Sequence, residues 1–242
     1  MTSAGGIALV TGGGRRLGRA LAVALGREGM SVAVHYNFSA DEAAETVRLI
    51  EERGGEAKAF QCDLAAPAGP EALLADIDSA YGKLHVLINS AAIMKRQALH
   101  DITVEDWEMT MSLNLRAPFF LARGAARLMS DGGSIVNIAD LAAFENWPAY
   151  VPHAISKAAV IKMTEAMARV LAPRVRVNAI APGAVLLPEG WSDESSERLA
   201  DTTPLGRIGE PDDVVAAMLY LVNADFVTGE TIIVDGGRHI RK

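Results

Sequence analysis

Ile7-Ala8-Leu9-Val10-Thr11-Gly12-Gly13-Gly14-Arg15-Arg16-Leu17-Gly18 is the stretch that decides the fold of this chain. Its first four residues are apolar and indicate a strand, and a helical pattern, Arg19–Gly29, follows the glycines. Glycines allow left-handed backbone and let a ligand come close, because no Cβ stands in the way. The helix that follows directs free N–H groups and the positive end of its dipole at the turn. The stretch therefore predicts a phosphate site, and in particular a site for the pyrophosphate of a dinucleotide.

The glycine spacing also leaves rival interpretations open. In the dinucleotide spacing G-x-G-x-x-G, Gly12 and Gly14 fit, but the third glycine comes one residue late, at Gly18. The P-loop of nucleoside triphosphatases fits Gly13 and Gly18, yet Arg19-Ala20 replaces the Lys-Ser/Thr that would hold phosphate and Mg²⁺. A further alternative is a strand-to-helix turn that merely needs small residues. The order of strand, turn and helix favours the dinucleotide.

Bulk composition agrees with one α/β domain spanning residues 1–242. The chain has 242 residues, half of them hydrophobic, which is enough to bury a full core. Its net charge of −7 disfavours binding to nucleic acid or to an anionic membrane. Cys62 is the single cysteine, so no internal disulfide and no cysteine metal cluster are expected. No run is long enough to span a membrane and no signal peptide is evident, so the cytoplasm is the expected location.

Short apolar runs alternate with helical patterns along the whole chain. Such strands, separated by helices, imply a Rossmann-like, doubly wound parallel sheet of about seven strands with helices on both faces. The expected strands are Ile7–Val10, Val32–Tyr36, Ala57–Gln61, Val86–Asn89, Ser134–Ile138, Arg174–Ile180 and Thr231–Val234. The expected helices are Arg19–Gly29, Ala40–Arg53, Pro70–Tyr81, Val104–Met129, His153–Leu171 and Pro211–Val222.

Ligands of such a sheet bind beyond the carboxyl ends of the strands. The residues just after the strands are therefore the candidates for a site: Gly12, His35–Ser39, Asp63, Asn89–Met94, Asp140 and Pro182–Val185. One long irregular stretch, residues 186–204, is rich in Pro, Ser, Asp and Glu. Because long loops in compact domains are usually functional or disordered, we interpret it as a substrate lid with a short helix near Ser192–Ala200.

A set of motifs in one order resembles the short-chain dehydrogenase/reductase family over nearly the whole chain. They are Thr11-Gly12-x-x-x-Arg16-x-Gly18, Asp63-Leu64, Asn89-Ser90-Ala91-Ala92, Asn114, Ile135-Val136-Asn137-Ile138, Ser156-Lys157-Ala158-Ala159, Arg176-Val177-Asn178, Pro182-Gly183 and Thr228-Gly229 with Asp235-Gly236-Gly237. Arg15 to Gly18, His35 to Ser39, and Asp140 are similar to the pteridine reductase branch. The resemblance implies hydride transfer with a nicotinamide cofactor, and a homo-oligomer, typically a tetramer formed through the long helices.

The end of the second expected strand predicts which cofactor is used. An Asp or Glu there would bind the ribose of NAD and repel a 2′-phosphate, but this strand ends in His35-Tyr36-Asn37-Phe38-Ser39. Arg15 and Arg16 lie in the adjacent turn, and guanidinium groups suit phosphate. We therefore expect NADP(H), with Arg16, Asn37 and Ser39 near the 2′-phosphate. The resemblance further implies that Asp63 binds the adenine. The full expected set is Gly12, Gly14, Arg15, Arg16, Leu17, Gly18, Tyr36, Asn37, Ser39, Asp63, Leu64, Asn89, Ser90, Ala91, Lys157, Pro182, Gly183 and Val185.

The resemblance places the chemistry on a helix that carries Lys157. Family members have Tyr-x-x-x-Lys there, because positions four apart share a helix face. Here His153 stands in the position of the tyrosine. Asp140 lies thirteen residues before it, where the family has Ser or, in the pteridine branch, Asp. Asn114 matches the family's proton-relay asparagine. The implied catalytic set is thus Asn114, Asp140, His153 and Lys157.

The sequence leaves three interpretations of the proton donor open. His153 is the acid/base, with Lys157 favouring neutral imidazole and Asp140 favouring imidazolium. Alternatively Tyr150, one helical turn earlier, supplies a phenol, although Pro152 places Tyr150 at or before the helix start. In the third interpretation the chain is a weakly catalytic or inactive nucleotide-binding protein that acts as a redox-sensing partner.

The substrate is less well defined by the sequence. Pteridine reductases usually present an aromatic residue after the motif at residues 89–92, but Ile93 and Met94 stand here. We expect reduction of a carbonyl or C=N group in a small, flat or hydrophobic compound. Candidates for an apolar pocket are Met94, Trp147, Tyr150, Leu186, Leu187 and Trp191.

Overall fold

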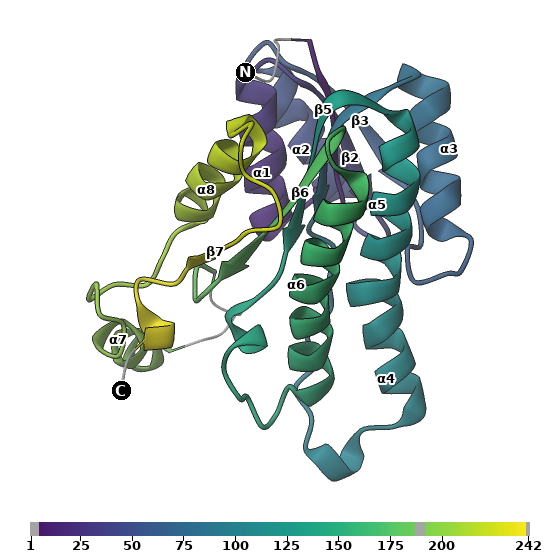
Figure 1. The fold of residues 1–242 in the computed structure, drawn as a ribbon. Coiled ribbons are helices and arrows are strands. Elements are labelled where there is room, and N and C mark those ends of the chain that lie inside the picture. The colour runs from purple at the N-terminus through teal and green to yellow at the C-terminus, as the bar shows by residue number, and fades with distance from the viewer. Residues whose placement is uncertain (1–4, 187–191, 241–242) are drawn as a thin grey trace.

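The computed structural model describes residues 5–186 and 192–240. Within these residues the chain forms a seven-stranded sheet in the order β3-β2-β1-β4-β5-β6-β7, and every neighbouring pair is parallel (Figure 1). The strands are β1 Ile7–Val10, β2 Ser31–Tyr36, β3 Glu56–Gln61, β4 Leu84–Asn89, β5 Met129–Ile138, β6 Val175–Pro182 and β7 Thr231–Val234. The predicted doubly wound α/β fold is confirmed.

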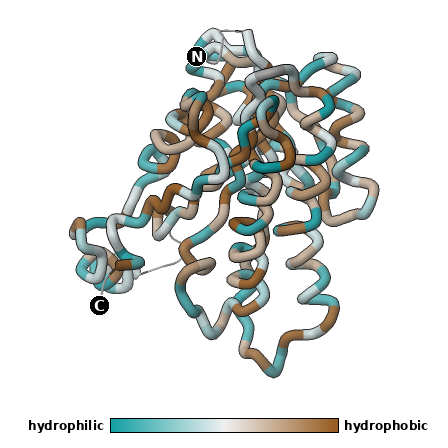
Figure 2. Tube along the Cα trace, in the orientation of Figure 1, coloured by the Kyte–Doolittle hydropathy of each residue, from teal (hydrophilic) through white to brown (hydrophobic). Residues whose placement is uncertain are grey.

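Helices cover both faces of the sheet. They are α1 Arg16–Arg27, α2 Ala40–Glu51, α3 Gly69–Tyr81, α4 Val104–Met111, α5 Ala117–Leu128, α6 Val151–Leu171, α7 Asp193–Asp201 and α8 Pro211–Asn223. One core lies between the sheet and α3, α5 and α6, and a second lies between the sheet and α1, α2 and α8. Figure 2 shows hydrophobic residues along the strands between these layers. Strands that are buried on both faces explain the continuous apolar runs in the sequence.

The strand order reverses between β1 and β4. The chain winds outward from β1 to β3 on one side and then returns to place β4 on the other side of β1. Such a switch point leaves a crevice at the carboxyl ends of the two strands, where open α/β sheets bind ligands. The glycine turn after β1 lies at this crevice.

The single helix predicted over Val104–Met129 is wrong. The structure breaks it into α4, a π-helical turn over Ser112–Arg116, and α5, and Met129 already belongs to β5. A π-turn adds one residue to a helical turn and rotates the side chains that follow; such turns are frequent at functional sites. The apolar pattern continues through the insertion, so periodicity alone did not reveal it.

The start of α6 agrees with the interpretation of Pro152. The helix begins at Val151, Pro152 occupies its first turn, and Tyr150 is the N-cap residue. The short helix expected near Ser192–Ala200 is observed as α7, whose N-cap Ser192 accepts a hydrogen bond from the Ser195 amide. Residues 187–191 of the expected lid, with Leu187 and Trp191, lie outside the described residues.

Candidate active site

The glycine turn and the loop after β4 are joined by one buried hydroxyl. Thr11 Oγ1 accepts hydrogen bonds from the amides of Ser90 and Ala91, at 2.9 and 3.0 Å. A Cβ on Gly12 would lie 3.1 Å from Ala91 Cα, and Gly12 has φ +65°. A side chain at this position would therefore be strained and crowded. The two loops form a narrow floor at the strand-order reversal.

Gly18 is required by the packing of the turn itself. A Cβ there would lie 2.1 Å from the Gly12 carbonyl oxygen, which no side chain can tolerate. The first hydrogen bond of α1 runs from the Arg19 amide to the Arg15 carbonyl, at 3.1 Å. The amides from Gly14 to Gly18 precede this first helical bond, so they are available to an anion at the positive end of the helix. This cradle fits the diphosphate of a dinucleotide.

A cavity of about 750 Å³ runs from the glycine turn to α6. Every residue expected to bind cofactor lines it, except Asn89. The Asn89 side chain lies behind the wall and donates to Asn137 Oδ1 at 2.8 Å. Asp140, His153 and Lys157 line the cavity as well, whereas Asn114 and Tyr150 do not. Of the expected apolar pocket, Met94 and Leu186 are in the lining and Trp147 is not.

The far end of the cavity lies beyond β2. Arg15 is exposed there, and the lining also contains Asn37, Ser39 and Glu42. Asp63 accepts a hydrogen bond from the Ala65 amide at 2.9 Å. Asn37 Nδ2 also donates to Asp63, at 3.4 Å. This end therefore presents polar groups around a solvent-facing guanidinium.

Lys157 is the buried cation of the site. Its side chain is 4 % exposed, and Nζ donates one hydrogen bond, 2.8 Å to the Ile138 carbonyl. Burial lowers the pKa of Lys157 to about 8, while the Asp140 carboxylate acts in the opposite direction. An ammonium has three N–H donors, so two remain for a ligand in the cavity.

His153 is fixed by the loop after β4 and by Asn114. The Asn114 side chain pairs with the Ile93 peptide through two bonds of 2.9 Å, one in each direction, and its amide also donates to Ser156 Oγ at 3.1 Å. His153 Nδ1 lies 3.1 Å from the same Ile93 carbonyl. Asn114 Nδ2 also lies 3.4 Å from His153 Nδ1, but its two N–H groups are engaged by the shorter bonds to Ile93 and Ser156. A proton on Nδ1 therefore completes the bond to the Ile93 carbonyl. The other ring nitrogen, Nε2, is thereby left for chemistry.

Asp140 faces that nitrogen. Its Oδ2 lies 3.5 Å from His153 Nε2, which is buried and has no hydrogen-bond partner among the described residues. Its Oδ1 accepts from the Ala142 amide at 2.7 Å, and this contact orients the carboxylate. The Asp140 side chain is 24 % exposed and His153 is 4 % exposed. Oδ2 of Asp140 and Nε2 of His153 are therefore placed to pass a proton between them.

Sequence reasoning missed several lining residues. His35 and Phe38 line the cavity; the strand-end rule included them in its range His35–Ser39, but the expected cofactor set left them out. Met109 and Leu113 also line it, from α4 and the π-turn. The unbroken helix predicted over these residues gave no reason to direct them at the site.

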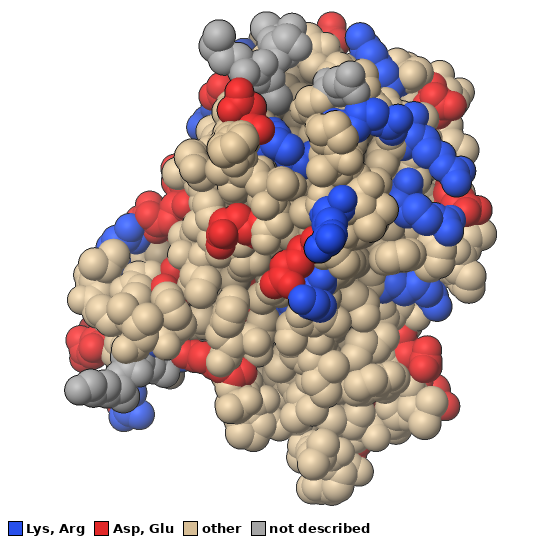
Figure 3. Space-filling model, in the orientation of Figure 1, with Lys and Arg blue, Asp and Glu red and all other residues tan. Residues whose placement is uncertain are grey.

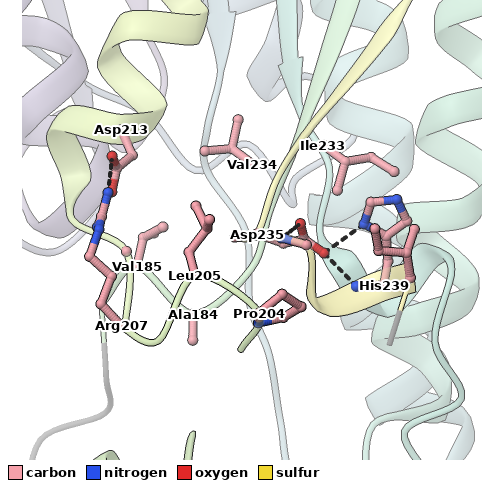
Figure 4. A pocket seen from close by; sticks show the side chains of 14 residues that line it. Ala184, Val185, Pro204, Leu205, Arg207, Asp213, Ile233, Val234, Asp235 and His239 are labelled. Carbon is pink, nitrogen blue, oxygen red and sulfur yellow. Dashed lines mark hydrogen bonds and ion pairs between the residues drawn. The ribbon is translucent and has the colours of Figure 1, made fainter. Parts of the chain in front are cut away.

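A second cavity of about 540 Å³ lies beside β7 and α8 (Figure 4). Its charged groups are already paired with one another. Arg207 makes two hydrogen bonds of 2.8 Å to the Asp213 carboxylate, and His239 Nδ1 lies 2.8 Å from Asp235 Oδ2. Figure 4 shows the two pairs at opposite sides of an otherwise largely apolar space. This cavity offers little free chemistry.

The comparisons with known proteins agree with this architecture. A family model described as enoyl-(acyl carrier protein) reductase matches residues 13–239. A 3-oxoacyl-[acyl-carrier-protein] reductase of Staphylococcus aureus is 32% identical, over 96% of this chain and 98% of its own. The 3beta-hydroxysteroid dehydrogenase 1 of Eggerthella lenta is 36% identical, over 95% of this chain and 92% of its own.

A solved structure shares the whole fold. The crystal structure of an angucycline C-6 ketoreductase with bound NADP has a TM-score of 0.91 and 32% identity, covering 98% of this chain and 96% of the other. In this chain, none of the helices within residues 5–186 and 192–240 is long and apolar enough to cross a membrane. The ordered motifs, the sheet and these relatives agree, and the chain belongs to the short-chain dehydrogenase/reductase family.

Proposed function

We propose that this protein is an NADP(H)-dependent reductase that reduces a carbonyl or C=N group of a flat, hydrophobic compound. The observation that supports it most is the grouping of Asp140, His153 and Lys157 in the same cavity as the glycine cradle. A bound nicotinamide would supply the hydride. The residues that would hold it are the cradle, at the diphosphate, and Lys157, whose free N–H donors suit ribose hydroxyls.

Selection of NADP(H) over NAD(H) rests on the residues beyond β2. Residues 36–40 contain no carboxylate, and Arg15 is exposed on the cavity rim, where a guanidinium can bind a 2′-phosphate. Arg16 is partly committed, because its Nη2 donates to the Leu186 carbonyl at 3.0 Å. Glu42 also lines the cavity, and its carboxylate would repel the 2′-phosphate, which reduces the preference for NADP(H) over NAD(H). The angucycline ketoreductase structure, which contains NADP, supports the same choice.

The proton step belongs to Asp140 and His153 together. Nε2 of His153 is covered, whereas Asp140 reaches the cavity, so the carboxyl is the group that meets the substrate. One proton leaves the pair: it moves from His153 Nε2 to the Asp140 carboxylate and from there to the substrate oxygen or nitrogen, while Nδ1 stays bound to Ile93. The pair is then an Asp140 carboxylate beside a neutral imidazole. Lys157 stabilises the negative charge that the pair is left with.

The substrate end of the cavity is apolar. Ile93, Met94, Met109, Leu113 and Leu186 line it, and a thioether contacts a flat ring favourably. Lys95, the cation that follows Met94, is engaged with Asp106, at 2.5 Å. These features favour a neutral compound over an acidic one. The steroid and angucycline named for two relatives are polycyclic, which supports a flat ketone as the substrate class.

NADPH oxidation against a panel of polycyclic ketones, quinones, 3-oxoacyl thioesters and dihydropterins tests the proposal. We expect turnover of a flat ketone, and a loss of about 10²-fold or more in kcat for both Asp140→Ala and His153→Ala. Tyr150→Phe is the matched control, because Tyr150 is the N-cap of α6 and does not line the cavity. Tight NADPH binding without turnover of any compound would instead assign a non-catalytic nucleotide-binding protein.

We also propose that the protein is a homo-oligomer, on the family resemblance and on its surface. The lower end of the face that carries α4 and α6 shows almost no charged side chains (Figure 3). Exposed apolar residues on this helical layer include Val104, Met109 and Ile155. Light scattering of the purified protein tests this; a monomer at micromolar concentration would contradict it. The cytoplasmic location stays a prediction.

A further inference from the structure

His35 is a buried histidine that the proposed proton transfer does not use. It is the last but one residue of β2, is 2 % exposed, and lies in the lining of the cofactor cavity. Buried titratable groups need partners for their polar atoms. The hydrogen-bond partners of His35 therefore indicate its protonation state and its role in the structure.

Three hydrogen bonds join His35 to the neighbouring strand ends. Its Nδ1 accepts from the Gly12 amide at 3.1 Å, and its Nε2 lies 3.0 Å from the Cys62 carbonyl. Its own carbonyl accepts from the Gly13 amide at 2.9 Å. The imidazole thus connects the turn after β1 with the end of β3.

These partners fix the protonation of the ring. A backbone amide is only a donor and a carbonyl is only an acceptor, so Nδ1 must carry a lone pair and Nε2 must carry the proton. The ring is therefore neutral. Burial lowers the pKa of His35, in agreement with this state, while the Asp63 carboxylate opposes the shift.

The hydrogen bonds also decide which amides of the turn can bind an anion. Gly12 and Gly13 donate to His35, so neither amide is left for a phosphate. Gly12 is in a left-handed conformation at φ +65°, and its amide is anchored by the imidazole. The amides from Gly14 to Gly18, ahead of the first hydrogen bond of α1, are the ones that remain.

We propose that His35 is a positioning residue that sets the conformation of the phosphate-binding turn, and through it the affinity for the dinucleotide. The inference rests on the proposed binding of NADP(H). It assigns the effect to one contact, the acceptor that Nδ1 offers to the Gly12 amide. The contact of Nε2 with Cys62 anchors the ring but does not touch the turn.

Two conservative variants separate these contacts. In His35→Asn the side-chain oxygen can take the place of Nδ1 and accept from Gly12, whereas the bond to Cys62 is lost. In His35→Gln the amide nitrogen can take the place of Nε2 and donate to Cys62, whereas the acceptor for Gly12 is lost. Both variants change a buried polar contact, so general destabilisation is matched between them.

The measurement is the Kd for NADP⁺ of the full-length protein by calorimetry, together with KM for NADPH and kcat. We expect His35→Asn to stay within about threefold of wild type and His35→Gln to bind about tenfold more weakly or worse, because a buried amide loses its partner. For His35→Gln the loss should appear in KM for NADPH, with kcat at saturation unchanged. Equal Kd values for the two variants would overturn the role of His35.

A measurement on the wild-type protein needs no variant to fold. Long-range ¹H–¹⁵N spectra of the imidazole should show His35 protonated at Nε2 and unprotonated at Nδ1 at pH 7. A proton on Nδ1 would contradict the inference directly. Absence of NADP⁺ binding by wild type would refute the proposed function instead, so the two failures are distinguishable.

Discussion

The two cavities of this molecule differ in how their charged groups are satisfied. Beside β7 and α8, Arg207 is bonded to Asp213 and Asp235 to His239, so each charge has a partner within the protein (Figure 4). In the cavity at the glycine turn, within residues 5–186 and 192–240, the Lys157 ammonium makes one hydrogen bond and His153 Nε2 makes none. Leaving buried polar groups unsatisfied costs free energy, and native structures tolerate it chiefly where a ligand completes the set. The contrast supports the proposal that the cavity at the glycine turn is the site and that the cavity beside β7 and α8 is structural.

The largest expected effect separates the two cavities by mutation. Lys157→Met removes the buried ammonium and should lower kcat/KM by on the order of 10²–10³-fold, as for the loss of a single preorganised charge-stabilising group. Arg207→Met is the matched control, because it removes a cation from the second cavity. Its steady-state rate should stay within about twofold of wild type. Equal losses in both variants would erase the distinction between the cavities.

Deprotonation of Lys157 should change activity and stability in opposite directions. As pH rises, kcat/KM should fall while the free energy of unfolding increases. With a pKa of about 8, the ammonium is present below pH 8, and kcat/KM should fall above it. The unfolded chain keeps its lysine protonated to about pH 10.4, so it binds more protons than the folded chain between those values. The free-energy cost of burying the ammonium therefore disappears as pH rises from about 8 to about 10.4, and the free energy of unfolding increases. Rate profiles and thermal melts of wild type and Lys157→Met check both directions; a rate that stays flat to pH 10 would contradict the assignment.

The smallest expected effect concerns the second cavity. The two hydrogen bonds from Arg207 lower the pKa of Asp213 to about 2. Because this value lies below that of the unfolded chain, the pair stabilises the fold above about pH 4 and loses its effect as pH falls toward 2. Asp213→Asn should lower Tm by about 1–3 °C at pH 7, with a gap that narrows below pH 4 and with activity retained. A loss of turnover in this variant would show that the second cavity takes part in the chemistry.

Much of the fold could be predicted from the sequence, because the sheet is covered on both faces and its strands are therefore continuous apolar runs. Ile7–Val10 and Thr231–Val234 coincide with β1 and β7, and Pro152 correctly set the start of α6. The break at Ser112–Arg116 was not accessible. The extra residue in the π-turn leaves the apolar pattern of the sequence intact, so periodicity does not reveal the break. The structure shows its consequence, which is that the Asn114 side chain pairs with the Ile93 peptide.

Part of the candidate site could likewise be predicted from the sequence, and part could not. The rule that ligands bind beyond strand ends selected Gly12, Asp140 and the segment at His35. It did not distinguish the residues that face the cavity from those behind the wall, such as Asn89, because side chains alternate direction along a strand. The grouping of Asp140 with His153 was expected from the family resemblance. That Nε2 is covered while Asp140 reaches the cavity depends on tertiary packing, which the sequence does not show.

Calorimetric titration of the purified protein with NADPH and with NADH is the decisive measurement of cofactor binding. We predict saturable binding of NADPH that is about tenfold or more tighter than that of NADH, with a smaller NADPH advantage in Arg15→Met. If neither nucleotide bound, the proposal that the glycine cradle and Lys157 hold a pyridine dinucleotide would be contradicted. A preference for NADH would contradict the assignment of Arg15 to the 2′-phosphate.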